Sequence, residues 1–374
     1  MSYPVADRPL WVPDCDRVAA ANMTAFARSA EGRWGRALPD YPALHAWSVN
    51  EPAEFWASIW ELGEVRGEMG SVVLENGHLM PGARWFPEAR LNFAENLLRS
   101  RDDSDAMVFW GEDRVKNRLS HGDLYRQVAH FAAALREMGV EPGDRVAAWM
   151  PNLPETIVVM LAAASIGAIF SSASPDFGVQ GVLDRFGQIE PKVLVAVDGY
   201  YYNDKIVDCM ERLAAITDGL PSVKRVVVVP YVHAHHDISH VHHARMLADF
   251  VKPFLAETEI PFARLPFDHP LYIMYSSGTT GVPKCIVHGA GGVLLQHIKE
   301  HRLHGDVKPG DKVFYFTTCG WMMWNWLVSG LASGATLLLY DGSPMIGDGA
   351  ILFDYAQAEG MTHFGTRSEE HTSE

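Results

Sequence analysis

Tyr275-Ser-Ser-Gly-Thr-Thr-Gly-Val-Pro-Lys284 is the most informative stretch of this 374-residue chain. It follows Leu271–Tyr275, a short apolar run whose length and aromatic or β-branched content predict a buried strand. Gly278 and Gly281 permit backbone angles that other residues resist, and successive N–H groups in such a turn form an anion-binding concavity. Lys284 adds a positive charge at the end of the loop. The stretch therefore predicts a phosphate-binding loop that follows a strand.

This loop differs from the P-loop of many nucleotide-binding proteins. The P-loop pattern requires Gly immediately before Lys, and Pro283 occupies that position here. A surface turn rich in Ser, Thr and Gly with a solvated lysine is the alternative interpretation. His288 lies close behind the loop, and we expect it to pack at the start of the next helix rather than to contact a ligand.

Composition and charge limit the class of protein. The chain is 48% hydrophobic and 21% charged, as is usual for a globular protein, and it exceeds one typical domain in length. A formal net charge of −15 disfavours nucleic acid and anionic membrane surfaces as main partners, because either requires a concentrated basic face. The most apolar segment, Ile157–Phe170, is shorter than the ~20 residues that span a bilayer. We therefore expect no membrane span.

The spacing of cysteines and histidines predicts no metal centre. Four cysteines lie far apart without a C-x-x-C pair, which argues against a zinc site and a disulfide framework and favours a reducing cytoplasm. Six histidines crowd residues 231–243, but they follow no zinc pattern, so we expect a solvated loop. Met1–Pro13 has no apolar core and predicts no signal peptide. The cysteines are Cys15, Cys209, Cys285 and Cys319.

From about residue 104 the chain alternates predicted strands and helices. Ser120 is a suitable N-cap for one helix, and Gly139 stands where that helix is expected to end. Strands separated by helices at this spacing imply an α/β fold with parallel sheets covered by helices, and such sheets bind nucleotides at the carboxyl ends of strands. Further strands are predicted at 145–150, 193–197, 225–229, 312–317 and 335–340, and further helices at 154–167, 178–189, 203–216, 291–303, 322–332 and 350–359.

The loop resembles the phosphate-binding signature of the adenylate-forming superfamily, which includes acyl-CoA synthetases, peptide-synthetase adenylation domains and luciferases. The resemblance implies that the loop holds the β- and γ-phosphates of ATP with Mg²⁺, and that Lys284 and Thr279 have catalytic roles. Many relatives have Gly where this chain has Cys285, and Cys285-Ile-Val-His288 resembles the acetoacetyl-CoA synthetase branch. The implied nucleotide-binding residues are Ser276, Ser277, Gly278, Thr279, Thr280, Gly281 and Lys284.

Residues 1–100 are rich in Trp, Pro and Arg and predict an N-terminal cap segment, with a helix at Glu51–Leu62. Within it, Leu44–Trp56 and Pro81–Leu97 resemble the N-terminal segment of acetyl-CoA and acetoacetyl-CoA synthetases. By the same resemblance, residues 101–366 correspond to part of an AMP-binding domain. The implied fold is the large N-terminal domain of an adenylate-forming enzyme, truncated before the C-terminal lid domain.

Two further sites follow from the resemblance. Gly320–Trp326 is similar to the segment that walls the acyl pocket, which implies substrate-binding roles for Trp321, Met322 and Met323. Methionine is adaptable and suits a small, partly polar acyl group. Asp198–Asn203 with Lys205 falls where related synthetases place part of the coenzyme A site, although the arginines of acetyl-CoA synthetases are not evident there.

The implied activity is that of an acid–thiol ligase of lipid and fatty acid metabolism. A carboxylate attacks the α-phosphorus of ATP to give an acyl-adenylate and pyrophosphate, and the coenzyme A thiol then displaces AMP. Acetoacetate is the expected acid, with acetoacetyl-CoA as the product. Two alternatives remain open: a ligase for another short acid such as acetate, propionate or butyrate, and a non-catalytic half-protein that binds nucleotide.

The last eight residues, 367–374, break the family pattern. Their sequence is what a common sequencing-adapter end encodes, so we expect a non-native tail, with a natural disordered polar tail as the alternative. The motifs that hold Mg²⁺ and ribose and the domain that carries the adenylation lysine would then be missing. We therefore expect residues 1–374 to be inactive and poorly soluble on their own.

Overall fold

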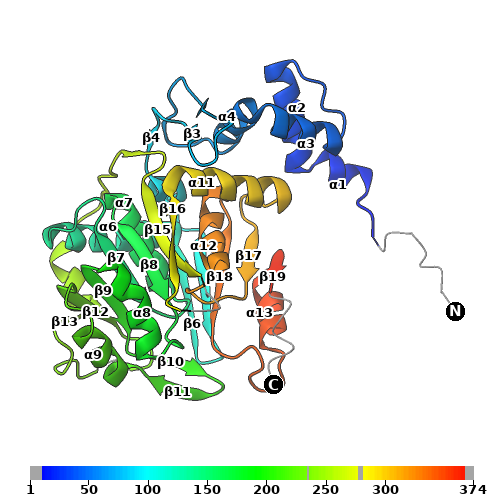
Figure 1. The fold of residues 1–374 in the computed structure, drawn as a ribbon. Coiled ribbons are helices and arrows are strands. Elements are labelled where there is room, and N and C mark those ends of the chain that lie inside the picture. Colours follow the sequence, from blue (N-terminus) through cyan, green and yellow to red (C-terminus); the bar gives the residue numbers. More distant parts are fainter. Residues whose placement is uncertain (1–10, 234–235, 277–280, 367–374) are drawn as a thin grey trace.

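A seven-stranded sheet forms the centre of the larger layer of the fold (Figure 1). The computed structural model describes residues 11–233, 236–276 and 281–366. Neighbouring strands run parallel throughout this sheet except at one edge, where β16 pairs antiparallel with β15. In spatial order the strands are β13 (Ala244–Met246), β12 (Arg225–Val229), β9 (Val193–Val197), β7 (Arg145–Trp149), β8 (Ile169–Ala173), β15 (Pro270–Ser276) and β16 (Lys284–Gly289).

A second sheet of five strands packs beside the first. It is parallel except for the antiparallel pair formed by β5 and β6. Both sheets therefore confirm the expected α/β class, while each carries one antiparallel edge that the sequence pattern did not reveal. The strand order is β19 (His363–Gly365), β17 (Lys312–Tyr315), β18 (Thr336–Asp341), β5 (Asp105–Gly111) and β6 (Val115–Ser120).

Helices cover the faces of these sheets (Figure 1). Every residue of α7 except Glu155 is buried, and α7 has 13 residues. In the described part of the chain, none of the helices is both long and apolar enough to cross a membrane. The helices are α6 (His121–Glu137), α7 (Pro154–Ile166), α8 (Val179–Ile189), α9 (Met210–Asp218), α10 (Leu247–Val251), α11 (Ala290–Lys299), α12 (Met322–Val328) and α13 (Ile351–Glu359).

The expected helix beginning after Ser120 is confirmed in its details. The Ser120 hydroxyl accepts the Asp123 N–H while the Asp123 carboxylate accepts the Ser120 N–H, a reciprocal capping box. At the other end Gly139 adopts a positive φ of 71°, which a glycine reaches without strain. Local sequence therefore sets both ends of α6.

The N-terminal segment forms a helical group at one end of the molecule, next to α11 (Figure 1). Its inner surface is aromatic: the rings of Phe26, Trp47 and Phe55 lie 5.8–6.4 Å apart, centroid to centroid. These residues act in packing. Its elements are α1 (Cys15–Ala19), α2 (Asn22–Trp34), α3 (Tyr41–Asn50), α4 (Pro52–Leu62), β1 (Gly67–Glu68), β2 (Leu74–Glu75), β3 (Arg84–Trp85), β4 (Arg90–Leu91) and α5 (Phe93–Leu97).

Two predictions about local structure were wrong. The helix expected at 203–216 begins only at Met210, because residues 199–208 form a hairpin of β10 (Gly199–Tyr202) and β11 (Lys205–Asp208). The segment after the phosphate loop was expected to enter a helix directly, but β16 intervenes. His288 therefore lies on a strand, where its ring packs 5.2 Å from that of Tyr272, and not at the start of a helix. In both places the two strands of a hairpin form backbone hydrogen bonds with each other. The periodicity of one segment alone cannot show such pairing.

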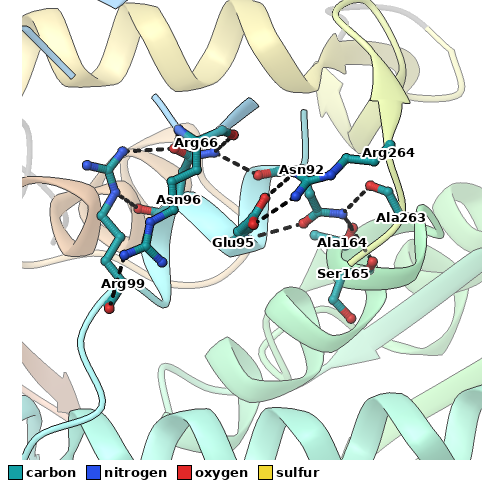
Figure 2. Close-up of polar contacts among 9 residues, drawn as sticks. All are labelled: Arg66, Asn92, Glu95, Asn96, Arg99, Ala164, Ser165, Ala263 and Arg264. Atoms are coloured by element: carbon teal, nitrogen blue, oxygen red, sulfur yellow. Dashed lines mark hydrogen bonds and ion pairs between the residues drawn. The ribbon is translucent and has the colours of Figure 1, made fainter. Parts of the chain in front are cut away.

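Asn92 ties the N-terminal segment to the central sheet layer (Figure 2). Its side chain is fully buried, and its amide group donates to the carbonyl oxygens of Ala164, Ser165 and Ala263 at 3.0–3.1 Å. Its side-chain oxygen accepts the Glu95 N–H and so caps α5. One amide thus joins the end of α7, the residues before β14 (Leu265–Pro266) and α5.

Asn96 repeats the arrangement one turn later in the chain (Figure 2). It is also fully buried, and its side chain both accepts the Arg66 N–H and donates to the Arg66 carbonyl oxygen, at 2.8 and 3.1 Å. The Arg99 guanidinium donates to the same Asn96 side-chain oxygen at 2.8 Å. Because buried polar groups are costly when unpaired, these contacts fix the entry of the chain into the main fold.

We predict that Asn92→Ala lowers the free energy of unfolding by about 2–4 kcal/mol, because it removes the donor to three buried carbonyl groups. Urea denaturation followed by tryptophan fluorescence measures the change. Asn117→Ala, at an exposed position on β6, is the matched control and should change stability by less than about 0.5 kcal/mol. Equal losses in the two variants would contradict the structural role of Asn92.

Candidate active site

The β15–β16 hairpin frames the expected phosphate loop. Ser276 is the last residue of β15 and pairs with Lys284, the first residue of β16, so the loop opens and closes at one point of the sheet edge. Gly281 has φ +96°, in the region that favours glycine. The expected ligands Ser277, Gly278, Thr279 and Thr280 lie outside the described residues.

The side chain of Gln188, from α8, contacts the residues at the end of the loop. Its amide nitrogen donates to the Pro283 carbonyl oxygen at 2.8 Å, and its oxygen lies 3.7 Å from the Cys285 sulfur. Lys284 is exposed, and within residues 281–366 and the other described ranges its ammonium group has no ion-pair partner. The hairpin therefore presents a cationic side chain beside the loop without neutralising it.

A cavity of about 590 Å³ lies along the far end of β16, and we call it the β16 cavity. Along a strand the four residue steps from Lys284 to His288 span ~13 Å, so the cavity begins a short distance from the loop. Met322 contributes to its wall, whereas Trp321 and Met323 do not. Its lining consists of residues 83–87, Phe267, Asp268, Val287, His288, Gly289, Gly292, Val293, Gln296, His297 and Met322.

His297 is the most deeply buried polar side chain of the β16 cavity, with 1% of its surface exposed. Its Nδ1 atom lies 2.7 Å from the Ser329 hydroxyl oxygen. Burial, with a smaller contribution from the nearby imidazoles of His301 and His288, lowers the pKa of His297 to about 3. The imidazole is therefore neutral at physiological pH.

A second cleft, of about 650 Å³, opens between the two sheets, and we call it the inter-sheet cleft. The hairpin residues Tyr200–Asn203 form one wall, opposite Thr317 and Thr318, which follow β17. Asp198, which precedes this hairpin, has a structural role: its fully buried carboxylate accepts the backbone N–H groups of residues 231–233 at 2.8–3.2 Å. Other lining residues are Pro151, Asn152, Ser174–Asp176 and Phe316, with Tyr340–Met345 closing the end.

Asp341 lies in the wall of the inter-sheet cleft, at the end of β18. Burial raises the pKa of its carboxyl to about 8, and the negative charges of Asp176 and Glu112 act in the same direction. In the folded protein this carboxyl is therefore protonated at neutral pH and can donate a hydrogen bond.

Three residues of the candidate site were not identified from the sequence: Gln188, His297 and Asp341. Each lies in an ordinary helix or strand pattern, without a motif around it. Asp341 follows the predicted strand 335–340 directly, and a carboxylate at the carboxyl end of a parallel strand was the one signal that pointed to a site. Gln188 and His297 become visible only when the helices that carry them are packed against the sheet.

The phosphate-type loop at the end of a strand of an α/β sheet, with two cavities beside it, defines a nucleotide-dependent enzyme class. The family model described as "AMP-binding enzyme" matches residues 93–367, and the model "Acetyl-coenzyme A synthetase N-terminus" matches residues 41–97. The chain belongs to the AMP-binding enzyme family.

Among individual proteins, the chain is similar to acetoacetyl-CoA synthetases. It is 55% identical over 365 residues to the acetoacetyl-coenzyme A synthetase of Rhizobium meliloti (strain 1021), covering 97% of this chain and 56% of that protein. It is 45% identical over 366 residues to the acetoacetyl-CoA synthetase of Danio rerio, covering 96% and 54%. The solved acetoacetyl-CoA synthetase from Streptomyces lividans superposes with a TM-score of 0.90 at 42% identity, covering 96% and 55%. The chain thus spans about half the length of these relatives.

We predict that Asp341→Asn becomes progressively more stable, relative to the parent, as the pH rises from about 4 to 8. In the parent the unfolded carboxyl ionises near pH 4 while the folded carboxyl stays protonated up to about pH 8, so the parent loses stability across this window. Asparagine does not titrate. Melting temperatures at pH 5, 6.5 and 8 measure the difference.

Asp103→Asn is the control for this series, because Asp103 is exposed and a solvated carboxylate contributes little to folding. A difference between Asp341→Asn and the parent that stays constant from pH 5 to 8 would show that Asp341 is ionised in the folded protein.

Proposed function

We propose that the complete protein to which this chain belongs is an AMP-forming acid–thiol ligase that converts acetoacetate, ATP and coenzyme A to acetoacetyl-CoA, AMP and pyrophosphate. The observation that carries the proposal is the shared strand β16. It begins at Lys284 beside the phosphate loop and ends at Gly289, and its last two residues, His288 and Gly289, line the β16 cavity. An acid bound in this cavity therefore meets the phosphates of a nucleotide bound at the loop. The names of the relatives support acetoacetate as the acid.

In this reaction the chain mainly neutralises charge and positions the reactants. A carboxylate oxygen forms a bond to the α-phosphorus, the bond from that phosphorus to the bridging oxygen breaks, and pyrophosphate leaves with the bonding electrons. Lys284, together with Ser276, Ser277, Gly278, Thr279, Thr280 and Gly281, is proposed to hold the β- and γ-phosphates. The ammonium group of Lys284, exposed and without an ion-pair partner among the described residues, supports this role. Met322 is proposed to contact the acyl group, with Trp321 and Met323 beside it.

We assign coenzyme A to the inter-sheet cleft. The cleft lies at the carboxyl ends of β7, β8 and β17, and Tyr200–Asn203 line it. The thiol loses its proton, its sulfur attacks the acyl carbon and AMP leaves. Mg²⁺ is proposed to accompany the β- and γ-phosphates of ATP at the loop. A cytoplasmic site of action stays part of the proposal.

Acid-dependent exchange of radiolabelled pyrophosphate into ATP tests the adenylation step, using the longest reading frame of the source DNA that contains this chain. Acetoacetate should support exchange, and acetate, propionate and butyrate should compete weakly. Faster exchange with one of these acids would assign the ligase to that acid instead. Nucleotide binding without exchange for any acid would favour the non-catalytic alternative.

We predict that Lys284→Met lowers the rate of pyrophosphate exchange by roughly 10²- to 10³-fold, because it removes a charge-stabilising donor at the phosphates. Lys308→Met is the matched control, since Lys308 is an exposed lysine that pairs with Asp306 at 2.9 Å, away from the loop. The control should retain the parent rate. Full activity of Lys284→Met would remove Lys284 from the site.

We predict that Tyr202→Ala raises the KM for coenzyme A roughly threefold to tenfold while leaving pyrophosphate exchange unchanged, because only the second step uses the inter-sheet cleft. Tyr202 is 52% exposed, so its removal should not disturb the fold. Tyr41→Ala, at a comparably exposed residue of the N-terminal segment, is the control. An unchanged KM for coenzyme A would argue against the assignment of this cleft.

A further inference from the structure

One ring nitrogen of His297 has no protein partner among the residues that the structure describes. The Nδ1 atom of His297 faces the Ser329 hydroxyl at 2.7 Å, so the ring is held in one orientation. The side chain is 1% exposed and lines the β16 cavity, and no described residue bonds to its Nε2 atom. A ligand in the cavity that bonds to Nε2 gains a hydrogen bond, and one that shields this nitrogen from water without bonding to it loses free energy.

The neighbouring polar side chains of the cavity are different. Gln296 is half-buried and donates to the Glu300 carboxylate at 3.3 Å, so it already has a partner. His288 is half-buried, and solvent can satisfy its ring nitrogens. His297 is therefore the side chain whose hydrogen bonding depends most on what occupies the cavity.

The Ser329 hydroxyl decides whether Nε2 of His297 donates or accepts. In one arrangement the hydroxyl donates to the Asn325 carbonyl oxygen at 3.1 Å, Nδ1 carries the ring hydrogen, and Nε2 is an acceptor. In the other arrangement the hydroxyl donates to Nδ1, and Nε2 carries the hydrogen. In the second arrangement the Asn325 carbonyl oxygen still accepts the backbone N–H of Ser329 at the end of α12, so only the Nε2 hydrogen is left for a ligand atom.

The size of the cavity makes such a polar contact necessary for selectivity. At about 590 Å³ the cavity is larger than a four-carbon acid, so its walls alone do not distinguish acetoacetate from butyrate. The two acids have the same number of carbons and differ at C3, where acetoacetate carries an oxygen that accepts hydrogen bonds. A site built to hydrogen-bond a substrate rejects the analogue that lacks the group far better than an apolar pocket does.

We propose that His297, oriented by Ser329, is the specificity-determining residue that donates a hydrogen bond from Nε2 to the C3 oxygen of a 3-oxo acid in the β16 cavity. The inference rests on the proposed function, and deepens it, by naming the contact that selects the acid. Because the imidazole is buried and neutral, it selects an uncharged oxygen and offers no ion pair to a second carboxylate, as in succinate.

The test compares kcat/KM for acetoacetate and butyrate in pyrophosphate exchange, using the complete protein. His297→Leu should lower the acetoacetate-to-butyrate ratio roughly 10- to 100-fold by removing the donor. His297→Gln, whose amide nitrogen can reach the place of Nε2, should retain more of the preference than His297→Leu. Ser329→Ala removes only the hydroxyl that orients the ring and should lower the ratio by a smaller factor.

His301→Leu is the matched control. His301 lies one turn further along the chain, is fully buried, and bonds through Nε2 to the Trp326 carbonyl oxygen at 2.7 Å, but it does not line the β16 cavity. Its replacement should change kcat/KM for both acids by the same factor. An equal loss for both acids is what a structural defect produces, and it leaves the acetoacetate-to-butyrate ratio of kcat/KM unchanged.

The outcomes separate the inference from the proposed function. If the parent exchanges pyrophosphate with acetoacetate and the folded His297→Leu variant keeps the parent ratio, the role of His297 is wrong while the function stands. If His297→Leu does not fold, Ser329→Ala decides, and an unchanged ratio there overturns the proposal. If the parent shows no exchange with any acid, the proposed function fails and the role of His297 fails with it.

Discussion

The antiparallel pairing of β15 with β16 is the constraint on which the candidate site depends. If the strand after the phosphate loop ran parallel to β15, the chain would first have to leave the sheet edge and return through a crossover connection. The hairpin instead returns the chain at once, so that Lys284 lies opposite Ser276 and His288 lies opposite Tyr272. One strand therefore connects the loop to the β16 cavity, and α11 follows directly after it with His297 on its buried side. The same backbone hydrogen bonds that complete the sheet edge fix the spacing between the two parts of the site.

Buried polar side chains hold the other parts of the fold at defined positions. Asn92 donates to three carbonyl groups, and the carboxylate of Asp198 accepts three backbone N–H groups. Each of these contacts links segments far apart in the sequence, and each would be costly to break because its partners are removed from water. His297 differs from both in that one of its ring nitrogens is left without a protein partner. Because His297 lines the β16 cavity, a ligand bound there can supply that partner.

Much of the fold could be predicted from the sequence, because most elements carry local signals. The Ser120 cap, the apolar run of β9 and the mostly apolar α7 with a proline at its start each specify their own structure. β16 could not be predicted in this way, since Cys285, Ile286 and Val287 are all exposed and show no alternation. The hairpin at residues 199–208 lacked a signal for the same reason, because its stability comes from pairing and not from periodicity. For the candidate site, the motif pointed to the loop and to Met322, whose roles stay predictions, whereas the partner of His297 is Ser329, which directly follows α12 and is brought to the ring only by tertiary packing.

The state of His297 follows from its surroundings and limits what the β16 cavity can select. Burial and the neighbouring imidazoles both disfavour the charged form, so the ring offers a directional hydrogen bond and no net charge. A charged lysine or arginine at the same place would attract any carboxylate, including the reactive carboxylate of the substrate itself, and would then bind the acid in the reversed orientation. A neutral donor in the wall of the cavity, combined with the cationic Lys284 at the loop, removes this ambiguity. The carboxylate is drawn toward the phosphate end by charge, and the uncharged oxygen is left to meet the imidazole.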